Sequence, residues 1–211
     1  MADEIDSLEQ GERARKWMQQ NGSAIIIGVL AAVAILMGYE AWKNRRVNHQ
    51  GKAGETYVQL SAAVTEKRKE DVASLSNAVA ADYTDTAYAA LARLDQAHSA
   101  VTDSNLAQAI AAAQQAVDTA RTDVLADTAR LRLARLQLAD AKPVLAQQTL
   151  DAIKSSGFAA QVKELRGDAL LKQGKSDDAR KAYEDALAGL DAGSPLRNGL
   201  QMKIDDLSTG S

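Results

Sequence analysis

Cysteine is absent from this chain of 211 residues, which excludes a disulfide framework, thiolate nucleophiles and zinc sites built on thiolates. Aromatic residues make up only 4% of the chain, and proline occurs twice. No stretch alternates apolar and polar residues for long enough to predict a strand. Alanine is abundant instead, and it favours closely packed helices. We therefore predict an all-α protein.

An excess of positive charge is also lacking. Residues 53–211 carry 18 Lys and Arg against 22 Asp and Glu, so their net charge is near −4. A nucleic-acid-binding domain needs a basic surface, so we expect no nucleic-acid partner. These residues are numerous enough to form one domain with a buried core.

The motifs of enzyme active sites are missing as well. The chain has no Gly-rich phosphate loop, no His-Glu-x-x-His and no Gly-x-Ser-x-Gly. Its two histidines, His49 and His98, are distant in sequence, whereas a metal site or a catalytic triad needs several groups that converge. We predict no catalytic residue, no metal site and no cofactor, and a membrane-bound hydrolase is disfavoured.

One stretch, from Trp17 to Tyr39, contains no charged residue. A bilayer core of roughly 30 Å needs about 20 helical residues. At about 1.5 Å per residue, the only two tryptophans, Trp17 and Trp42, lie roughly 37 Å apart in a helix, which suits indoles at the two headgroup levels. We predict four segments: a short N-terminal tail (1–16), a transmembrane anchor helix in contact with lipid (17–42), a juxtamembrane connection (43–54) and a helical domain (55–211).

A buried core helix or a cleaved signal peptide would show a similar apolar run. The rest of the chain is amphipathic, so it offers no apolar shell around a core helix. The run is followed by Gly38-Tyr-Glu-Ala-Trp-Lys43, which lacks the small residues of a cleavage site. The flanking charges leave the orientation open, because three Lys or Arg precede the span and four follow it.

The predicted anchor also carries small residues at helical spacing. Such small-xxx-small patterns let two helices approach closely in lipid, although they arise by chance in alanine-rich spans. We predict a face that packs against another membrane helix, made of Ala24, Gly28, Ala32, Ala34 and Gly38.

From Glu55 onward, apolar residues recur with the helical period, interrupted by short polar breaks at 102–104, 154–157, 174–177 and 191–195. The C-terminal part contains the spacing of a 34-residue tetratricopeptide repeat, with small residues where helices cross and an aromatic residue that fills the gap to the next repeat. The matching residues are Gly167, Leu170, Gly174, Ala179, Tyr183 and Ala186. Ser176 is expected to cap the second helix of this pair.

Two further copies of the pattern precede this one. Thirty-three residues earlier, Ala134, Ala141, Ala146 and Leu150 align with Gly167, Gly174, Ala179 and Tyr183, and Pro143 falls in the first turn of a helix. A looser copy is anchored by Ala97, Ala109, Ala113 and Ala116, with an insertion expected near 102–104. Ser194-Pro195 then begins a last helix with Leu196, Leu200, Ile204 and Leu207 on one face. We predict a tetratricopeptide-like α-solenoid of antiparallel helix pairs with a C-terminal capping helix.

In tetratricopeptide domains the first helix of each repeat lines a concave groove. The corresponding residues here lack the Lys, Asn and Arg set that holds acidic peptide C-termini, and they are partly apolar. We hypothesise that this groove receives an apolar segment or a partner helix, and the same leucines could equally pack the core. The candidate groove residues are Leu91, Leu94, His98, Leu131, Arg135, Leu138, Glu164, Asp168 and Leu171.

This order of parts resembles the ancillary SecYEG translocon subunit family of Gram-negative bacteria. The resemblance covers essentially the whole chain, and its more specific segments are 17–22 (Trp-Met-Gln-Gln-Asn-Gly), 82–91 (Asp-Tyr-Thr-Asp-Thr-Ala-Tyr-Ala-Ala-Leu) and 133–138 (Leu-Ala-Arg-Leu-Gln-Leu). It implies a single-pass protein of the inner membrane, with a cytoplasmic N-terminus and a periplasmic C-terminal domain. It also implies association with the SecYEG translocon, with a PpiD-type periplasmic chaperone and with nascent secretory proteins, and it supplies no catalytic residue.

The function expected from these observations is that of a non-enzymatic accessory subunit. Such a subunit would link the Sec translocon to periplasmic chaperones and assist secretory or outer-membrane protein traffic through its repeat domain. An alternative from another class is a membrane-anchored regulatory scaffold whose cytoplasmic tail, residues 1–16, docks a signalling protein.

Overall fold

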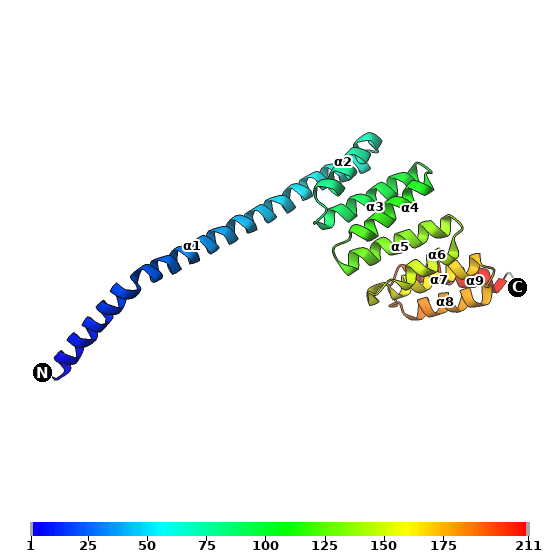
Figure 1. Ribbon diagram of the computed structural model, residues 1–211. Helices are drawn as coiled ribbons and strands as arrows, with labels where there is room; N and C mark the ends of the chain where they lie inside the picture. Colours follow the sequence, from blue (N-terminus) through cyan, green and yellow to red (C-terminus); the bar gives the residue numbers. More distant parts are fainter. Residues whose placement is uncertain (1, 210–211) are drawn as a thin grey trace. The chain divides into compact units, whose positions relative to one another are not determined.

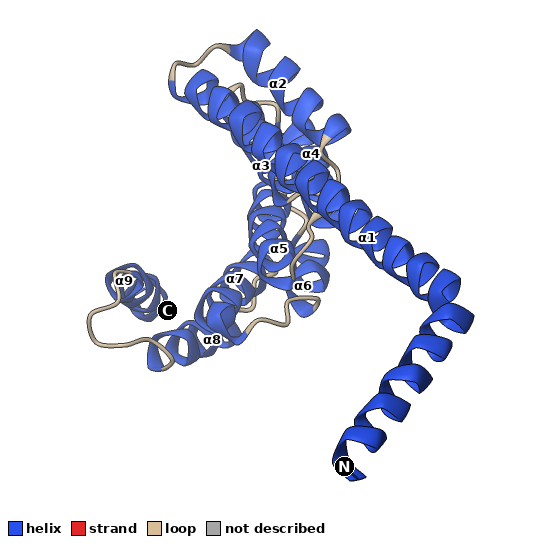
Figure 2. Cartoon of the chain, turned by 90° about the vertical axis from the view of Figure 1, so that its left-hand side faces the viewer, coloured by secondary structure: helices blue, strands red, loops and turns tan. Residues whose placement is uncertain are grey.

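The computed structural model describes the backbone of residues 2–209 and the side chains of residue 11 and residues 13–208. Within this described part every regular element is a helix (Figure 2). In chain order the elements are α1 (Ala2–Thr65), α2 (Lys69–Asp82), α3 (Ala87–Thr102), α4 (Leu106–Thr119), α5 (Asp123–Ala139), α6 (Pro143–Asp151), the 3-10 helix η1 (Ser156–Phe158), α7 (Ala159–Lys172), α8 (Ser176–Ala188) and α9 (Leu196–Thr209).

Helix α1 is longer than the predicted anchor. It includes residues 17–42, and it continues through the predicted connection at 43–54, where Gly51 and Gly54 do not end it. The chain divides into two compact units between His49 and Gln50, inside this helix. The first unit is helical from Ala2 onward. The second unit contains the end of α1 and all later helices.

The second unit is a stack of helix hairpins, as predicted. Neighbouring helices pack as α3 with α4, α5 with α6 and α7 with α8, and each hairpin is antiparallel (Figure 1). Contacts also join α3 to α5 and α5 to α7, so the first helices of successive hairpins form a layer of their own. Helix α9 packs on α8, where Leu200 and Ile204 are buried against Tyr183, which confirms the predicted cap.

The turn inside each hairpin contains one residue with a positive φ. These residues are Lys67 (58°), Ser104 (58°), Ala141 (54°) and Gly174 (77°). A left-handed residue after a helix lets the next backbone N–H groups bond to the last carbonyls, as when Arg68 N donates to Ala63 O at 2.9 Å. Only the last turn uses glycine, the residue that adopts this conformation without steric cost.

The repeated turn reveals a helix pair that the sequence analysis missed. The end of α1 and α2 form a first hairpin, in which Leu60, Val72, Ser76 and Val79 occupy the buried positions of Ala97, Ala109, Ala113 and Ala116 in the next one. The sequence analysis missed this pair because the side-chain sizes are exchanged: the first helix carries the large Leu60 and the second helix carries the small Ser76. The last hairpin has the opposite arrangement, with Gly167 opposite Tyr183.

Two expectations about individual turns were wrong. No insertion lies at 102–104, because Ala97 and Ala109 have the same separation as Ala134 and Ala146. Four extra residues instead lie after Ala109, where α4 is a longer helix than α6. Ser176 is the first residue of α8 rather than its cap, since Lys175 holds the cap position and no side-chain hydrogen bond is made there.

The expectation for Pro143 is confirmed. It begins α6, where its missing N–H has no partner to lose and its fixed φ suits the helix. Two neighbouring helices use side-chain caps instead: Asn105 accepts a hydrogen bond from Gln108 N at 3.1 Å, and Thr122 Oγ1 accepts one from Leu125 N at 3.3 Å.

Candidate functional site: a groove between first helices

The groove residues predicted from α5 and α7 meet at a hollow between these helices. Arg135 and Leu138 come from α5, and Asp168 and Leu171 come from α7. The hollow has a volume of about 290 Å³, and Ala139, Leu165 and Lys172 complete its lining. Leu171 is 41% exposed, so it presents apolar surface at the hollow.

The rim of this hollow is cationic. Arg135 and Lys172 make no ion pair with any described residue, whereas Asp168 is neutralised from outside the hollow. The Lys203 ammonium of α9 lies 2.8 Å from Asp168 Oδ1 and 2.8 Å from Glu164 Oε1. The hollow therefore offers an apolar floor and unpaired positive charge.

Glu164 does not line the hollow. It belongs to a cluster of Glu164, Asp168, Tyr183 and Lys203, which we call the latch. Lys203 bridges both acids and lies 5.3 Å from the centre of the Tyr183 ring, and Tyr183 donates a hydrogen bond to Asp168 Oδ1 at 2.7 Å. Burial opposes the charge of Lys203, but its hydrogen bonds to Asp168 and Glu164 outweigh burial and raise its pKa. Burial, followed by the bond to Asp168, raises the pKa of Tyr183. The four groups hold the cap on the last hairpin.

The remaining predicted leucines lie inside the protein. Leu94 packs with Ala116 and Ala129, and Leu131 packs with residues of α6 and α7, and each is 5% exposed. Leu91 is partly buried against the Leu94 cluster. For these residues the structure supports the packing interpretation and not a groove surface. They occupy the first-helix positions that the repeat predicts, but neighbouring helices cover those positions.

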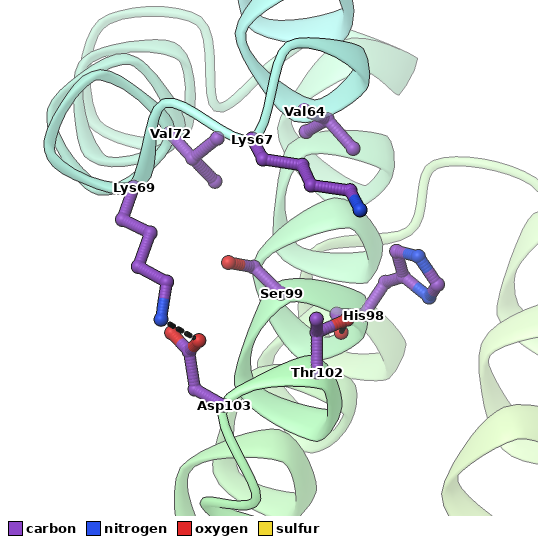
Figure 3. Close-up of a pocket in the computed structure, with 8 residues that line it drawn as sticks. All are labelled: Val64, Lys67, Lys69, Val72, His98, Ser99, Thr102 and Asp103. Carbon is purple, nitrogen blue, oxygen red and sulfur yellow. Dashed lines mark hydrogen bonds and ion pairs between the residues drawn. The ribbon is translucent and has the colours of Figure 1, made fainter.

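His98 lies elsewhere again. It is exposed on α3 and lines a second hollow with residues of α1 and α2, which Figure 3 shows. The sequence analysis found none of its neighbours there, because the first hairpin had not been recognised.

One structural acid was also missed. Asp127 of α5 is 1% exposed, and its Oδ2 accepts hydrogen bonds from Ser155 Oγ at 2.6 Å, Ser155 N at 2.9 Å and Lys154 N at 3.1 Å. Arg130 donates to Oδ1 at 2.7 Å. Burial alone would raise the pKa of Asp127, but these hydrogen bonds outweigh it and lower the pKa. The sequence did contain a signal for this buried acid: Asp127 lies four residues before Leu131, so the two share one face of the helix.

A second polar contact ties the end of α1 to α3. The rings of Tyr57 and Tyr88 lie 5.4 Å apart, and the charge of Asp95 acts on the Tyr57 hydroxyl. Burial raises the pKa of Asp95, although the Tyr57 hydroxyl and Arg132 oppose the change. Burial and then the charge of Asp95 raise the pKa of Tyr57 to about 12. These groups stabilise the first hairpin against the second.

The first unit contains the predicted span. The part of α1 from Arg13 to Thr65 is long and apolar enough to cross a membrane. Large apolar side chains in it are exposed, as in Ile35 at 70%, so it is not the buried core of a described domain. The predicted packing face, with Gly28 at its centre, lies on this exposed helix; Arg46 lies 5.7 Å from the Trp42 ring.

The hairpin stack, its terminal cap and the apolar first helix define a class: a tetratricopeptide-repeat-like protein with a candidate membrane span. The family model described as a tetratricopeptide repeat-like domain matches residues 15–209. The chain is 34% identical over 200 residues to the ancillary SecYEG translocon subunit of Escherichia coli strain K12, across 95% of this chain and 96% of the relative.

A second relative agrees. The chain is 27% identical over 208 residues to the ancillary SecYEG translocon subunit of Haemophilus influenzae, across 98% of this chain and 100% of the relative. This chain belongs to the family of ancillary SecYEG translocon subunits, which confirms the resemblance seen in the sequence. No solved structure matches it.

Proposed function

We propose that this protein is a non-enzymatic accessory subunit of the Sec translocon. It links the translocon to periplasmic chaperones of the PpiD type and assists the traffic of nascent secretory or outer-membrane proteins. Family membership supports this role, since the relatives carry the translocon in their names. The observation that carries the binding role is the hollow between α5 and α7, where Arg135, Leu138, Asp168 and Leu171 meet.

The chemistry of that hollow suits an apolar segment or a partner helix. Leu171 is the exposed apolar side chain of the hollow, and covering it with an apolar side chain of a partner gains free energy. Leu138 and Leu165 also line the hollow but are themselves buried. Arg135 and Lys172 at the rim then attract acidic residues that flank the inserted side chain. Tethering raises the effective concentration, so a groove of low intrinsic affinity suffices.

In this proposal the span in α1 fixes where the domain acts. The tail of residues 1–16 is cytoplasmic, residues 17–42 cross the inner membrane, and residues 55–211 are periplasmic. The small-residue face around Gly28 packs against another membrane helix of the translocon or chaperone.

The absence of cysteine makes this topology easy to test. Single variants Ser7→Cys and Ser176→Cys each carry one thiol for a membrane-impermeant maleimide. In intact spheroplasts we expect labelling at position 176 only, and labelling at position 7 only after lysis. Labelling of position 7 in intact spheroplasts would contradict the proposed orientation.

Partner binding is tested by a photocrosslinking residue placed at Leu171, with Val144 as the matched control. Both positions are exposed and apolar, but Val144 lies on α6 outside the hollow. We expect Leu171 to crosslink to a translocon subunit or a periplasmic chaperone, and Val144 not to do so. Equal crosslinking yields at both positions would contradict the proposal that this groove binds a partner.

Removal of residues 2–16 separates this proposal from the regulatory scaffold. The truncated protein should still co-purify with the translocon. Loss of that association, with loss of a bound cytoplasmic protein, would favour the scaffold instead.

A further inference from the structure

A second hollow lies between the first two hairpins, apart from the groove between α5 and α7. It has a volume of about 190 Å³ and is formed by the end of α1, the start of α2 and the C-terminal half of α3. Figure 3 labels its lining residues, which are Val64, Lys67, Lys69, Val72, His98, Ser99, Thr102 and Asp103. Among them, only His98 had been named as a candidate binding residue from the sequence.

The two sides of this hollow differ in charge. Lys69 forms an ion pair with Asp103, so these two charges compensate each other on one side. Lys67 and His98 extend toward one another on the other side (Figure 3). Lys67 makes no ion pair with any described residue. A histidine ring carries at least one N–H in either protonation state. This side can therefore donate hydrogen bonds to an anion.

The remaining lining is mainly small and apolar. Val64 and Val72 contribute methyl groups, and Thr102 already donates its hydroxyl hydrogen to His98 O at 3.2 Å. Pockets for drug-sized ligands hold roughly 300–1,000 Å³, so a hollow of about 190 Å³ admits one side chain and not an acyl chain or a nucleotide. The ligand must join an anion to a single apolar group.

A polypeptide C-terminus meets this requirement in one residue, because the carboxylate and the side chain share one α-carbon. An internal Asp or Glu does not, because the nearest side chain on the same face of an extended segment is two residues away, about 7 Å along the chain. We propose that this hollow binds the free C-terminal carboxylate of a polypeptide whose last side chain is apolar. The carboxylate accepts hydrogen bonds from Lys67 and His98, and the side chain lies against Val64 and Val72. This site goes beyond the proposed function.

The test uses the full-length protein in detergent and a fluorescein-labelled peptide, Gly-Ser-Gly-Ser-Ala-Leu, followed by fluorescence anisotropy. The free acid should bind at least tenfold more tightly than the same peptide with a C-terminal carboxamide, because charge-assisted hydrogen bonds are the strong ones. Lys67→Gln should remove most of this preference. Lys181→Gln, which removes an exposed cation of α8 that lines neither hollow, should leave the preference unchanged.

Equal affinity for acid and carboxamide would overturn the proposal, as would an equal effect of Lys67→Gln and Lys181→Gln. Equal affinity for the same peptide ending in Gly instead of Leu would also overturn it, because the apolar side chain would then contribute nothing. Unchanged circular dichroism of Lys67→Gln shows that the variant is folded. Crosslinking at Leu171 is independent of Lys67, so failure here is distinguishable from failure of the proposed groove.

Discussion

Tyr183 lies so close to Gly167 that a β-carbon on residue 167 would come within 2.3 Å of Tyr183 Cε1. The ring cannot move away freely, because its hydroxyl donates to Asp168 Oδ1 at 2.7 Å and its face lies beside Lys203. Gly167 is therefore needed for space and not for its backbone conformation. The pair joins the two helices of the last hairpin and also supports the cap.

Gly167→Ala should lower the free energy of unfolding by about 1–3 kcal/mol, the usual cost of overpacking a core. Thermal unfolding of the full-length protein in detergent measures the change. Adding Tyr183→Leu recreates the Ala134–Leu150 pair of the preceding hairpin, so the double variant should recover part of the loss. Gly199→Ala is the control: its β-carbon meets open space, and it should stabilise α9 by roughly 0.5–1 kcal/mol. Equal effects of the two alanines would contradict this account.

Asp127→Asn should cost about 1–3 kcal/mol of folding free energy at neutral pH, because Ser155 and Lys154 lose a charged acceptor in a buried site. The native pKa of Asp127 lies below its ordinary value of 3.8, so its stabilisation is complete above that value and is lost as the pH falls toward the native pKa.

The difference between wild type and Asp127→Asn should therefore shrink below about pH 4. Urea unfolding across this range measures it. Asp118→Asn is the control, because Asp118 is exposed and only accepts a hydrogen bond from Gln114. A constant difference at all pH values would rule out this role for the carboxylate.

Lys203→Gln should loosen α9, since Glu164 and Asp168 would then face each other without a cation. The loss should be about 1 kcal/mol, because the side chain is 34% exposed and water screens the charges. Hydrogen exchange should accelerate across residues 196–209 and remain unchanged in α3. Lys181→Gln, on the exposed face of α8, should have no such effect, and unchanged exchange in both variants would contradict the latch.

Tyr57→Phe should raise the pKa of Asp95 further, because the Tyr57 hydroxyl favours the charged carboxylate. A carboxyl whose native pKa is raised weakens folding as the pH rises through that value. The variant should thus lose about 1 kcal/mol at neutral pH and little below pH 3.8, where Asp95 is protonated in both states. Tyr88→Phe keeps the ring contact and is the control; equal losses at both pH values would contradict the prediction.

Repetition in the sequence predicted the later hairpins because small residues at helix crossings are a local requirement. Gly167, Ala134 and Ala97 each need little volume, and each recurs at the right distance from its partner on the second helix. The first hairpin escaped notice because Leu60 and Ser76 satisfy the same packing with the sizes exchanged. Either member of such a pair can be the large one, and a pattern of residue types at fixed positions does not record this exchange.

The candidate groove was predicted in part for a related reason. The repeat register placed Arg135, Leu138, Asp168 and Leu171 on facing first helices, and they do line one hollow. The same register also selected Leu94 and Leu131, which neighbouring helices cover. A register specifies the direction of a side chain from its helix, but exposure depends on what packs against that helix.

The sequence by itself determined the helical class, the apolar segment between Trp17 and Trp42 and the repeat family, because each depends on composition or on short-range periodicity. Only the tertiary structure decided that Lys203 closes on Glu164 and Asp168, and that Lys67 and His98 border one hollow. These groups are about 30 residues apart or more, and their meeting depends on how successive hairpins stack. Stacking is a sum of many packing contacts, so no single motif encodes it.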